Sequence, residues 1–474
     1  MAALFGKRNK PRPKRTFRSI SPRSQQRARA PHWSSASFFD GTWNNAFNAQ
    51  KGGGEGSYAV APTNVYYLSQ RYKNGSNFDI VNENGTGVCR KFHSEYVRGV
   101  GTVTGEDDSL IGGAVGMGAT GVEATVARTA LRIGQIIDTL SPGIEPDEII
   151  LDVFGFSRGA AAARYCVNAF RQGWVDHNPI FGDRIRGRLP EDRDVKIRFL
   201  GIFDTVASIG LGFVEYNWGV NIHLDESKQT TGGMFHITAD HESRVNFRLN
   251  EAMPGGGLQH GMPGAHGDIG GSYKTPGDLA PLTPLHTYQN PTRGFAEGTR
   301  SRLRDAPVTS NPRWVTDGWV NANEVDQAFQ RTVSTITPRT IPGPMGVPMI
   351  SYEVTSAVYL NRPWVKLGLS TVAMHAMHEH ARRHQVPFLD LPASAAYRVP
   401  EDLQPLVPMV VNGQRPPLAY SRHILHDYGH VSANSQSTGM EGQSDGDACY
   451  TTIARAKRFD LVLQQQVFDF AHAF

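Results

Sequence analysis

The chain has 474 residues, 39% of them hydrophobic, and a formal net charge of +4. A chain of this length and apolar content can bury a large core, which excludes collagen-like, coiled-coil and wholly disordered classes. Fifty glycines and 29 prolines indicate many loops. No apolar run reaches the length of a membrane span. The cysteines are few and far apart, which indicates neither a disulfide scaffold nor a thiolate metal site and favours a reducing compartment; they are Cys89, Cys166 and Cys449.

The basic character lies in an N-terminal arm, residues 1–31, which we predict to be disordered. Residues 1–39 hold ten lysines and arginines and no acid, so the other 38 basic and 44 acidic residues leave the body at −6. No apolar segment follows these charges, so a secretory signal is not predicted. The composition of the arm fits three interpretations: a solvated tail, a segment that binds anionic lipid or nucleic acid, or a signal recognised by an export machine. Its few aromatics argue against a single-stranded nucleic-acid site.

The first half of the chain alternates helices and strands. In chain order, the predicted elements are an ordered segment at 34–39, a helix at 63–72, a helix at 122–140, a strand at 149–154, a helix at 160–170 and a strand at 196–203. The helix at 122–140 is predicted from apolar residues spaced three or four apart, and the strand at 149–154 from a nearly continuous apolar run. This alternation predicts an α/β fold with a mostly parallel sheet and helices on both faces.

The second half is less regular. Its predicted features are a functional loop at 254–273, short strands such as 349–352 in a Pro/Thr/Arg-rich section, a helix at 366–385, a polar loop at 430–450 and a final helix at 451–470. We therefore predict a core over 32–275, an insertion at 276–363, a closing helix of the core at 364–388 and an accessory region at 389–474. The insertion and the accessory region are expected to form a lid or an accessory layer.

The strongest chemical signal is the Gly155-x-Ser157-x-Gly159 pattern between the buried strand and the next helix. A serine nucleophile must stand on a tight turn, and glycines are needed where side chains would clash with the strand or the helix. The start of the helix also offers free N–H groups and a positive dipole end to a developing oxyanion. The alternative is a glycine-rich helix start that only packs closely or binds an anion.

A serine nucleophile needs a general base and an acid that orients this base. Asp204 ends the next predicted strand and His266 lies in a later glycine-rich loop, which fits the order serine, acid, histidine of α/β-hydrolases. By spacing alone the choice stays open: the rival acids are Asp225, Asp240 and Asp268, and the rival bases are His236, His241 and His260. Asp204 could instead cap a helix, and His266 could be an ordinary loop histidine.

An oxyanion hole usually takes one N–H from the residue after the nucleophile and a second from an early loop. Arg158 would supply the first. Gly41 and Thr42 are candidates for the second, because a glycine lets backbone approach a ligand closely. The alternative, that Asp40-Gly41 forms a simple turn with no catalytic role, is equally well supported by the sequence.

Six stretches carry a resemblance to a known family. They are Phe39–Asn44, Pro62–Val65, Gly99–Thr102, Gly155–Ala160 with Ala163-Arg164, Phe203–Val206, and Pro263–Gly271; Asp240–Arg244 resembles a further family stretch. On these motifs residues 36–275 resemble the α/β-hydrolase family that includes the type VI secretion phospholipase effectors, formerly a domain of unknown function. Two departures stand out: Ser272 replaces a usual glycine, and His260-Gly261-Met262 replaces an apolar strand end, which predicts a distorted last strand.

The resemblance implies a Ser157–Asp204–His266 triad that hydrolyses phospholipid esters. We expect this reaction to need no metal or organic cofactor. It also implies a phospholipid membrane surface as a partner, a secretion-apparatus component or chaperone, and an immunity protein. The protein would be cytoplasmic in the producing cell and exported without a signal peptide into a rival cell. The alternatives are a soluble carboxylesterase, which would lack activation at an interface, and a non-catalytic scaffold, which would not need an intact triad.

Other polar residues carry weaker signals. Asp40 and Asp268 are expected to support the triad by orienting loops, or to hold a hard cation through oxygen ligands. Two groups of histidines could ligate metal, and in both cases an amphipathic surface helix is the favoured interpretation. The first group is His375, His378, His380 and His384; the second is His423, His426 and His430 with Asp427.

Overall fold

The computed structural model of the chain describes residues 32–75, 79–83, 86–108, 120–140, 148–172, 174–177, 185–188, 195–207, 222, 233–244, 247–252, 257–283, 285–308, 310 and 312–432. The basic arm at 1–31 and the predicted final helix at 451–470 lie outside these residues, as does most of the polar loop at 430–450.

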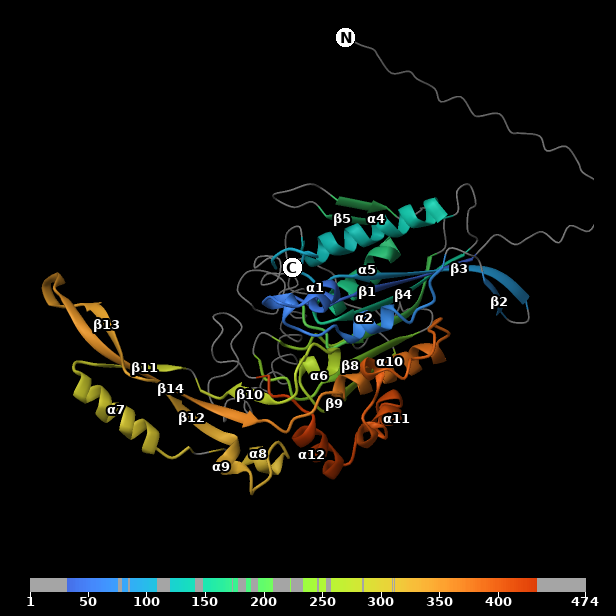
Figure 1. Cartoon of the computed structure of the whole chain (residues 1–474). Helices are drawn as coiled ribbons and strands as arrows, with labels where there is room; N and C mark the ends of the chain where they lie inside the picture. Colours follow the sequence, from blue (N-terminus) through green and yellow to red (C-terminus); the bar gives the residue numbers. More distant parts are fainter. Residues whose placement is uncertain are drawn as a thin grey trace, which may run out of the picture.

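A seven-stranded sheet forms the centre of the body, in the order β2-β3-β1-β4-β7-β8-β9 (Figure 1). Its strands are β2 (Asp79–Glu83), β3 (Thr86–Val97), β1 (His32–Phe39), β4 (Glu148–Phe156), β7 (Val195–Phe203), β8 (Met234–Ala239) and β9 (Leu258–Met262). All neighbouring strands are parallel except β2 and β3, which are antiparallel. The predicted α/β class with a mostly parallel sheet is confirmed.

Helices cover both faces of this sheet (Figure 1). α4 (Val122–Leu140) and α5 (Arg158–Gln172) pack on one face in an apolar cluster that includes Val153 of β4. α2 (Asn64–Ser69) and α10 (Leu369–Arg383) pack on the opposite face in a second cluster that includes Phe154. Because successive side chains of a strand point to opposite faces, a strand covered on both faces is mostly apolar, and β4 is apolar except at Glu148 and Asp152.

The last strand of the sheet is regular, so the expected distortion at His260–Met262 is wrong. β9 pairs with β8 in an unbroken parallel register from Phe235 opposite Leu258 to Ala239 opposite Met262. His260 and Met262 are both buried within the strand, so they fill the places that apolar residues would take.

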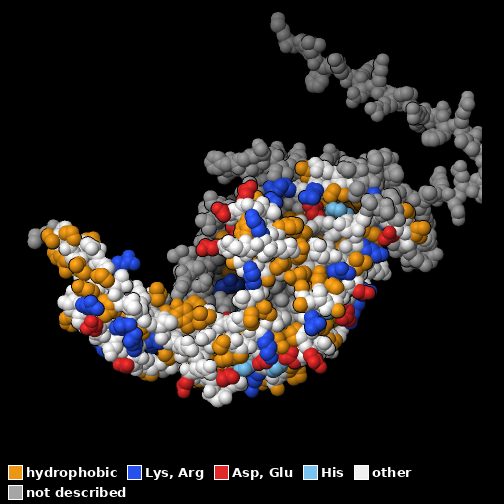
Figure 2. All heavy atoms as spheres, viewed as in Figure 1, with side chains coloured by type: hydrophobic (Ala, Val, Ile, Leu, Met, Phe, Trp, Pro, Cys, Tyr) orange, Lys and Arg blue, Asp and Glu red, His pale blue; other side chains and the backbone are white. Residues whose placement is uncertain are grey.

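The insertion forms a second sheet, which we call the β-projection (residues 278–362). Its long strand β14 (Pro348–Arg362) pairs antiparallel with four strands: β10 (Asp278–Pro281), β11 (His286–Asn290), β12 (Phe329–Val333) and β13 (Thr337–Pro342). The β-projection extends away from the body (Figure 1), and hydrophobic side chains gather at its far end (Figure 2). The predicted strand at 349–352 is therefore the beginning of a much longer one.

The remaining elements flank the two sheets. They are α1 (Ala46–Lys51), a 3-10 turn at Gly56–Tyr58, β5 (Trp174–His177), β6 (Ile185–Arg188), α6 (His266–Gly270), α7 (Arg293–Asp305), α8 (Arg313–Thr316), α9 (Val325–Ala328), 3-10 turns at Pro344–Gly346, Ala395–Tyr397 and Glu401–Leu403, α11 (Leu406–Val411) and α12 (Leu418–Asp427). α11 packs on α10, so residues after 388 extend the body. Within the described ranges, no helix has both the length and the apolarity required to cross a membrane.

Candidate active site

Ser157 stands on a sharp turn between β4 and α5. Its φ of 58° lies in the left-handed region that non-glycine residues rarely adopt. A Cβ on Gly155 would lie 2.3 Å from the carbonyl oxygen of Gly159, and a Cβ on Gly159 would lie 2.2 Å from that of Phe39. Both glycines are therefore required for strand, turn and helix to come this close. The Ser157 N–H donates to the Phe203 carbonyl (3.1 Å), which fixes the turn beside the end of β7.

Asp204 and His266 form a buried hydrogen-bonded pair next to this turn. The distance from His266 Nδ1 to Asp204 Oδ2 is 2.6 Å, and the two residues are 5% and 2% exposed. Asp204 directly follows β7, and its Oδ1 accepts a hydrogen bond from the Ala239 N–H (2.9 Å). A carboxylate at Nδ1 holds the imidazole with Nε2 available as a base, the arrangement a serine nucleophile requires. The structure therefore brings together the predicted acid and base beside Ser157.

The rival histidines are engaged elsewhere. His236 is completely buried, accepts the Thr205 N–H at Nε2 (3.2 Å), and burial lowers its pKa to about 3, so it is a neutral structural residue. Nδ1 of His241 accepts the Gly264 N–H (3.2 Å), which supports the loop before His266. Burial lowers the pKa of His260 in β9.

The rival acids also have other partners, where the structure describes them. Asp240 forms an ion pair with Arg415. Asp268 is hydrogen-bonded to a different histidine, His430. Asp225 lies outside the described residues.

The predicted oxyanion loop follows β1 and packs against the nucleophile turn. The Gly41 N–H donates to Asp40 Oδ1 (2.7 Å), so this amide is occupied, which leaves Thr42 as the donor from this loop. Asp40 also accepts hydrogen bonds from Thr63 Oγ1 (2.7 Å) and the Tyr96 hydroxyl (2.6 Å). Burial raises the pKa of Asp40 to about 7 in spite of these three hydrogen bonds. Asp40 is thus a buried organiser of the loop.

Three residues that the sequence did not single out surround His266. Glu242 Oε2 accepts the His266 N–H (3.2 Å), and Glu242 Oε1 accepts from Arg244 Nε (2.9 Å). Burial would raise the pKa of Glu242, but the positive charge of Arg244 outweighs the effect of burial and lowers this pKa. Glu242 is therefore an ionised carboxylate. The Phe247 ring contacts the His266 ring edge-on, with centroids 5.0 Å apart. The match of Asp240–Arg244 to the family stretch was the signal that could have identified this group.

Asp268 forms a second acid–histidine pair. Its Oδ1 lies 2.7 Å from His430 Nδ1, and its Oδ2 accepts the N–H groups of Ala265 and His430 (both 2.9 Å). His430 stacks on Tyr273, whereas His266 packs against Phe156, the residue before Ser157. Of the two pairs, the one containing His266 therefore lies beside the nucleophile turn.

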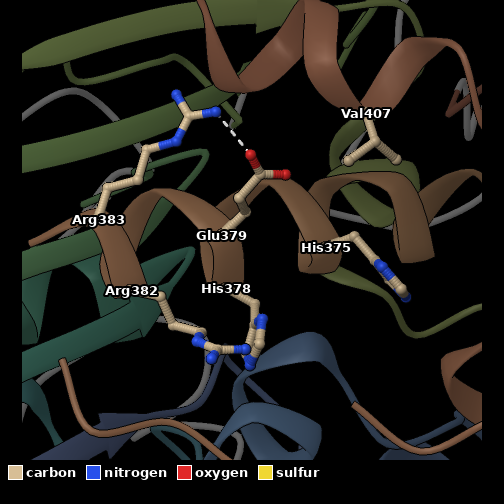
Figure 3. Close-up of a pocket in the computed structure, with 6 residues that line it drawn as sticks. All are labelled: His375, His378, Glu379, Arg382, Arg383 and Val407. Carbon is tan, nitrogen blue, oxygen red and sulfur yellow. Dashed lines mark hydrogen bonds and ion pairs between the residues drawn. The ribbon is translucent and has the colours of Figure 1, made fainter. Parts of the chain in front are cut away.

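His375 and His378 of α10 line a pocket of about 460 Å³, together with Val407 of α11 (Figure 3). His375 Nε2 bonds to the Tyr397 carbonyl (2.6 Å) and His378 Nε2 to the Leu389 carbonyl (2.9 Å), so both anchor the chain after the helix. Glu379 and Arg383 pair across one helical turn (Figure 3). This pocket contains none of the residues predicted to be catalytic.

In the second histidine group, Asp402, His423 and Asp427 present ligand atoms within 4.8 Å of one another, the one such metal-competent group among the described residues. Lys366 Nζ lies 2.7 Å from Asp427 Oδ2, and the Tyr428 hydroxyl donates to Asp402 (2.6 Å). These contacts make the group a surface network of ion pairs and hydrogen bonds.

The sheet order, the strained turn and the polar groups at the ends of parallel strands define an α/β protein with a hydrolase-like fold. A solved structure titled "Structure of the Tle1 effector bound to the VgrG spike from the Type 6 secretion system" shares this fold, with a TM-score of 0.56 and 23% identity over 86% of this chain and 85% of that chain. A crystal structure of an uncharacterized protein from Pseudomonas aeruginosa gives a TM-score of 0.43 and 17% identity over 83% of this chain and 52% of that one.

Residues 183–288 match the family described as "T6SS, Phospholipase effector Tle1-like, catalytic domain". The resemblance found in the sequence is therefore confirmed as a similarity of this segment to the Tle1-like phospholipase effectors. The matched range contains Asp204 and His266, and Ser157 precedes it. No curated protein matches the sequence.

Proposed function

We propose that the protein is a serine hydrolase that cleaves carboxylic ester bonds of phospholipids. The observation that carries this proposal is the buried Asp204–His266 pair, with its 2.6 Å hydrogen bond, at the end of the strand beside Ser157. In the described structure Ser157 Oγ and His266 do not yet share a hydrogen bond, and catalytic contacts of this kind often tighten only when substrate binds.

The proposed reaction begins when Ser157 Oγ attacks the ester carbonyl and His266 Nε2 takes the hydroxyl proton. Asp204 holds Nδ1–H and stabilises the imidazolium. The N–H groups of Arg158, in the first turn of α5, and of Thr42 would stabilise the oxyanion. His266 then gives the proton to the leaving alcohol, and a water hydrolyses the acyl-enzyme.

The family supports the substrate class and the biological setting of this proposal. The matched family is one of phospholipase effectors, and the Tle1 effector of the solved structure is bound to a VgrG spike. We accordingly infer that this chain is a type VI secretion effector of phospholipase A type. A spike protein of the VgrG kind would carry it into a rival bacterial cell, and an immunity protein would protect the producer.

The test is covalent labelling with a fluorophosphonate probe, together with hydrolysis of mixed phospholipid vesicles followed by mass spectrometry of the products. Ser157→Ala should abolish labelling and lower kcat by roughly 10⁴-fold or more, because the nucleophile is lost while its environment remains. Lysophospholipid and free fatty acid are the expected products. Labelling of another serine, or full activity of the variant, would end the proposal.

A further inference from the structure

The last described residues of the chain, Gly429–Ser432, lie against the loop that carries His266. We call this stretch the clamp segment. It follows α12, more than 160 positions after His266 in the sequence, and Gly429, His430 and Val431 are buried. All four of its residues take part in hydrogen bonds to other parts of the body.

One side of the clamp segment holds Asp268, two residues after His266. Both oxygens of Asp268 are engaged by His430, through the ring Nδ1 (2.7 Å) and the backbone N–H (2.9 Å). Asp268 in turn accepts the N–H of Ala265, the residue before His266 (2.9 Å). Ala265 and Asp268, which flank His266 and Gly267, are thus joined through the Asp268 carboxylate. His430 holds this carboxylate in place.

The other side of the clamp segment holds Glu242. The Ser432 hydroxyl donates to Glu242 Oε1 (2.7 Å), and Glu242 Oε2 accepts the backbone N–H of His266 itself (3.2 Å). The Ser243 N–H also donates to Ser432 Oγ (3.2 Å). The clamp segment therefore reaches His266 by two independent routes.

The clamp segment is itself fixed to the root of the β-projection. The Gly429 carbonyl accepts from Arg362 Nη2 (2.6 Å), at the end of β14, and the Val431 N–H donates to Asp278 Oδ2 (3.2 Å), at the start of β10. Arg362 is completely buried and pairs with Asp278. The Arg362–Asp278 ion pair therefore connects both ends of the β-projection to the clamp segment.

We propose that His430 and Ser432 are positioning residues, which set the place of the His266 imidazole between Asp204 and Ser157. This inference rests on the proposed function and deepens it. His430 donates through Nδ1–H to Asp268. Burial alone would lower the pKa of His430, but the charge of Asp268 outweighs it and the pKa is raised, as expected for a histidine held by a carboxylate.

The physical reason is that α6 has only five residues and cannot position its own first residue. A helix this short gains little from its internal hydrogen bonds, so its geometry depends on side chains that reach it from outside. Displacing a catalytic group by about 1 Å can cost 10²-fold in rate.

The experiment compares His430→Ala, His430→Asn and Ser432→Ala in the full chain, after circular dichroism has confirmed their folding. His430→Ala should lower kcat for a short soluble ester by roughly 10- to 100-fold with KM nearly unchanged. His430→Asn, whose amide can donate from the place of Nδ1, should recover most of this loss. Ser432→Ala should have a smaller effect. His423→Ala, a half-exposed histidine of α12, is the matched control and should behave like the wild type.

A second measurement does not depend on activity. The proton on Nδ1 of His266, in its short hydrogen bond to Asp204, should give a low-field NMR resonance that His430→Ala shifts or broadens and His430→Asn restores. Unchanged kcat and an unchanged resonance in His430→Ala would overturn the proposal, as would an equal loss in both His430 variants with the resonance intact. If instead Ser157→Ala keeps full activity, the proposed function fails, while the resonance still tests the clamp segment.

Discussion

Two of the three residues proposed to be catalytic have strained backbones. Ser157 and Asp204 have φ values of 58° and 35°, and such conformations cost on the order of 1 kcal/mol or more for non-glycine residues. Each is held by a backbone hydrogen bond to the neighbouring strand, Ser157 to Phe203 (3.1 Å) and Asp204 to Ile237 (2.7 Å). The sheet thus stabilises a geometry that the isolated turns would not adopt.

Glu95, near the end of β3, allows a prediction on pH dependence. It is 8% exposed, its Oε2 has no hydrogen-bond partner among the described residues, and burial raises its pKa to about 7 against the opposing charge of Arg132. Between the usual value near 4.5 and 7 the folded state binds the proton more tightly than the unfolded state. The free energy of unfolding should therefore fall as pH rises through this window, by up to about 3 kcal/mol.

Glu95→Gln should remove this contribution, so its free energy of unfolding should depend less on pH and exceed that of the wild type at pH 8. Chemical denaturation at several pH values between 4.5 and 8 measures the difference between the two proteins, in which the contributions of other groups cancel. Parallel curves for the two proteins would show that Glu95 is ionised in the folded state.

At the scale of elements, the centre of the sheet is joined across β4 and β7 by a buried ion pair. Asp152 of β4 is completely buried, and Arg198 of β7 donates to it through Nε (2.9 Å). The Tyr72 hydroxyl donates to the other oxygen of Asp152 (2.8 Å), which brings the segment after α2 into the same network. With these partners, both oxygens of the buried Asp152 carboxylate accept hydrogen bonds.

Arg198→Met should destabilise the protein by about 3–5 kcal/mol, because it leaves Asp152 buried without its countercharge. Arg382→Met is the matched control: this arginine pairs with Asp390 at the surface, where the two side chains are 49% and 86% exposed. Its loss should cost less than about 1 kcal/mol. Urea denaturation measures both, and equal effects of the two substitutions would contradict the assignment.

The elements that the sequence predicted best are those whose pattern depends on local burial. β4, α4, α5, β7 and α10 are all observed, because a strand or helix covered by a core has a regular apolar pattern. β3 was not predicted, since Thr86–Val97 contains polar residues that only its neighbours in the sheet stabilise, such as Arg90, which bonds to Ser34 of β1 (3.0 Å). Likewise the strands of the β-projection depend on pairing over long distances with β14.

In the candidate site, too, local features were predicted from the sequence and long-range contacts were not. Ser157 was indicated by its local setting, and the family resemblance selected Asp204 and His266 from several rivals. Glu242 and His430 were not recognised as parts of the site, because the fold brings them to His266 and Asp268 from 24 and 162 positions away in the sequence. No periodicity or spacing carries that information.

At the scale of the whole molecule, the sequence sets a basic arm against an acidic remainder, and the β-projection carries exposed apolar side chains. The ten basic residues of the N-terminal arm contrast with a body of net charge −6. The far part of the β-projection exposes hydrophobic side chains, among them Val347 (61%) and Ile350 (56%). Each basic residue near an anionic membrane contributes about 1 kcal/mol, and salt screens this attraction.

Deletion of residues 2–30 should therefore leave hydrolysis of a short soluble ester unchanged but weaken binding to anionic vesicles, and high salt should have the same effect on the intact protein. Vesicle co-sedimentation at low and high ionic strength measures this, with uncharged vesicles as the control. Equal binding of the truncated and intact proteins to anionic vesicles at low salt would favour an export or chaperone role for the basic arm.

The length of β14 has a consequence for binding. Fifteen residues at about 3.3 Å each make a strand of about 50 Å, stiffened by four partner strands. Its last residue, Arg362, donates a hydrogen bond to the Gly429 carbonyl of the clamp segment. A partner that binds the exposed end, near Met349 and Ile350, would therefore contact the same strand whose other end holds the clamp segment.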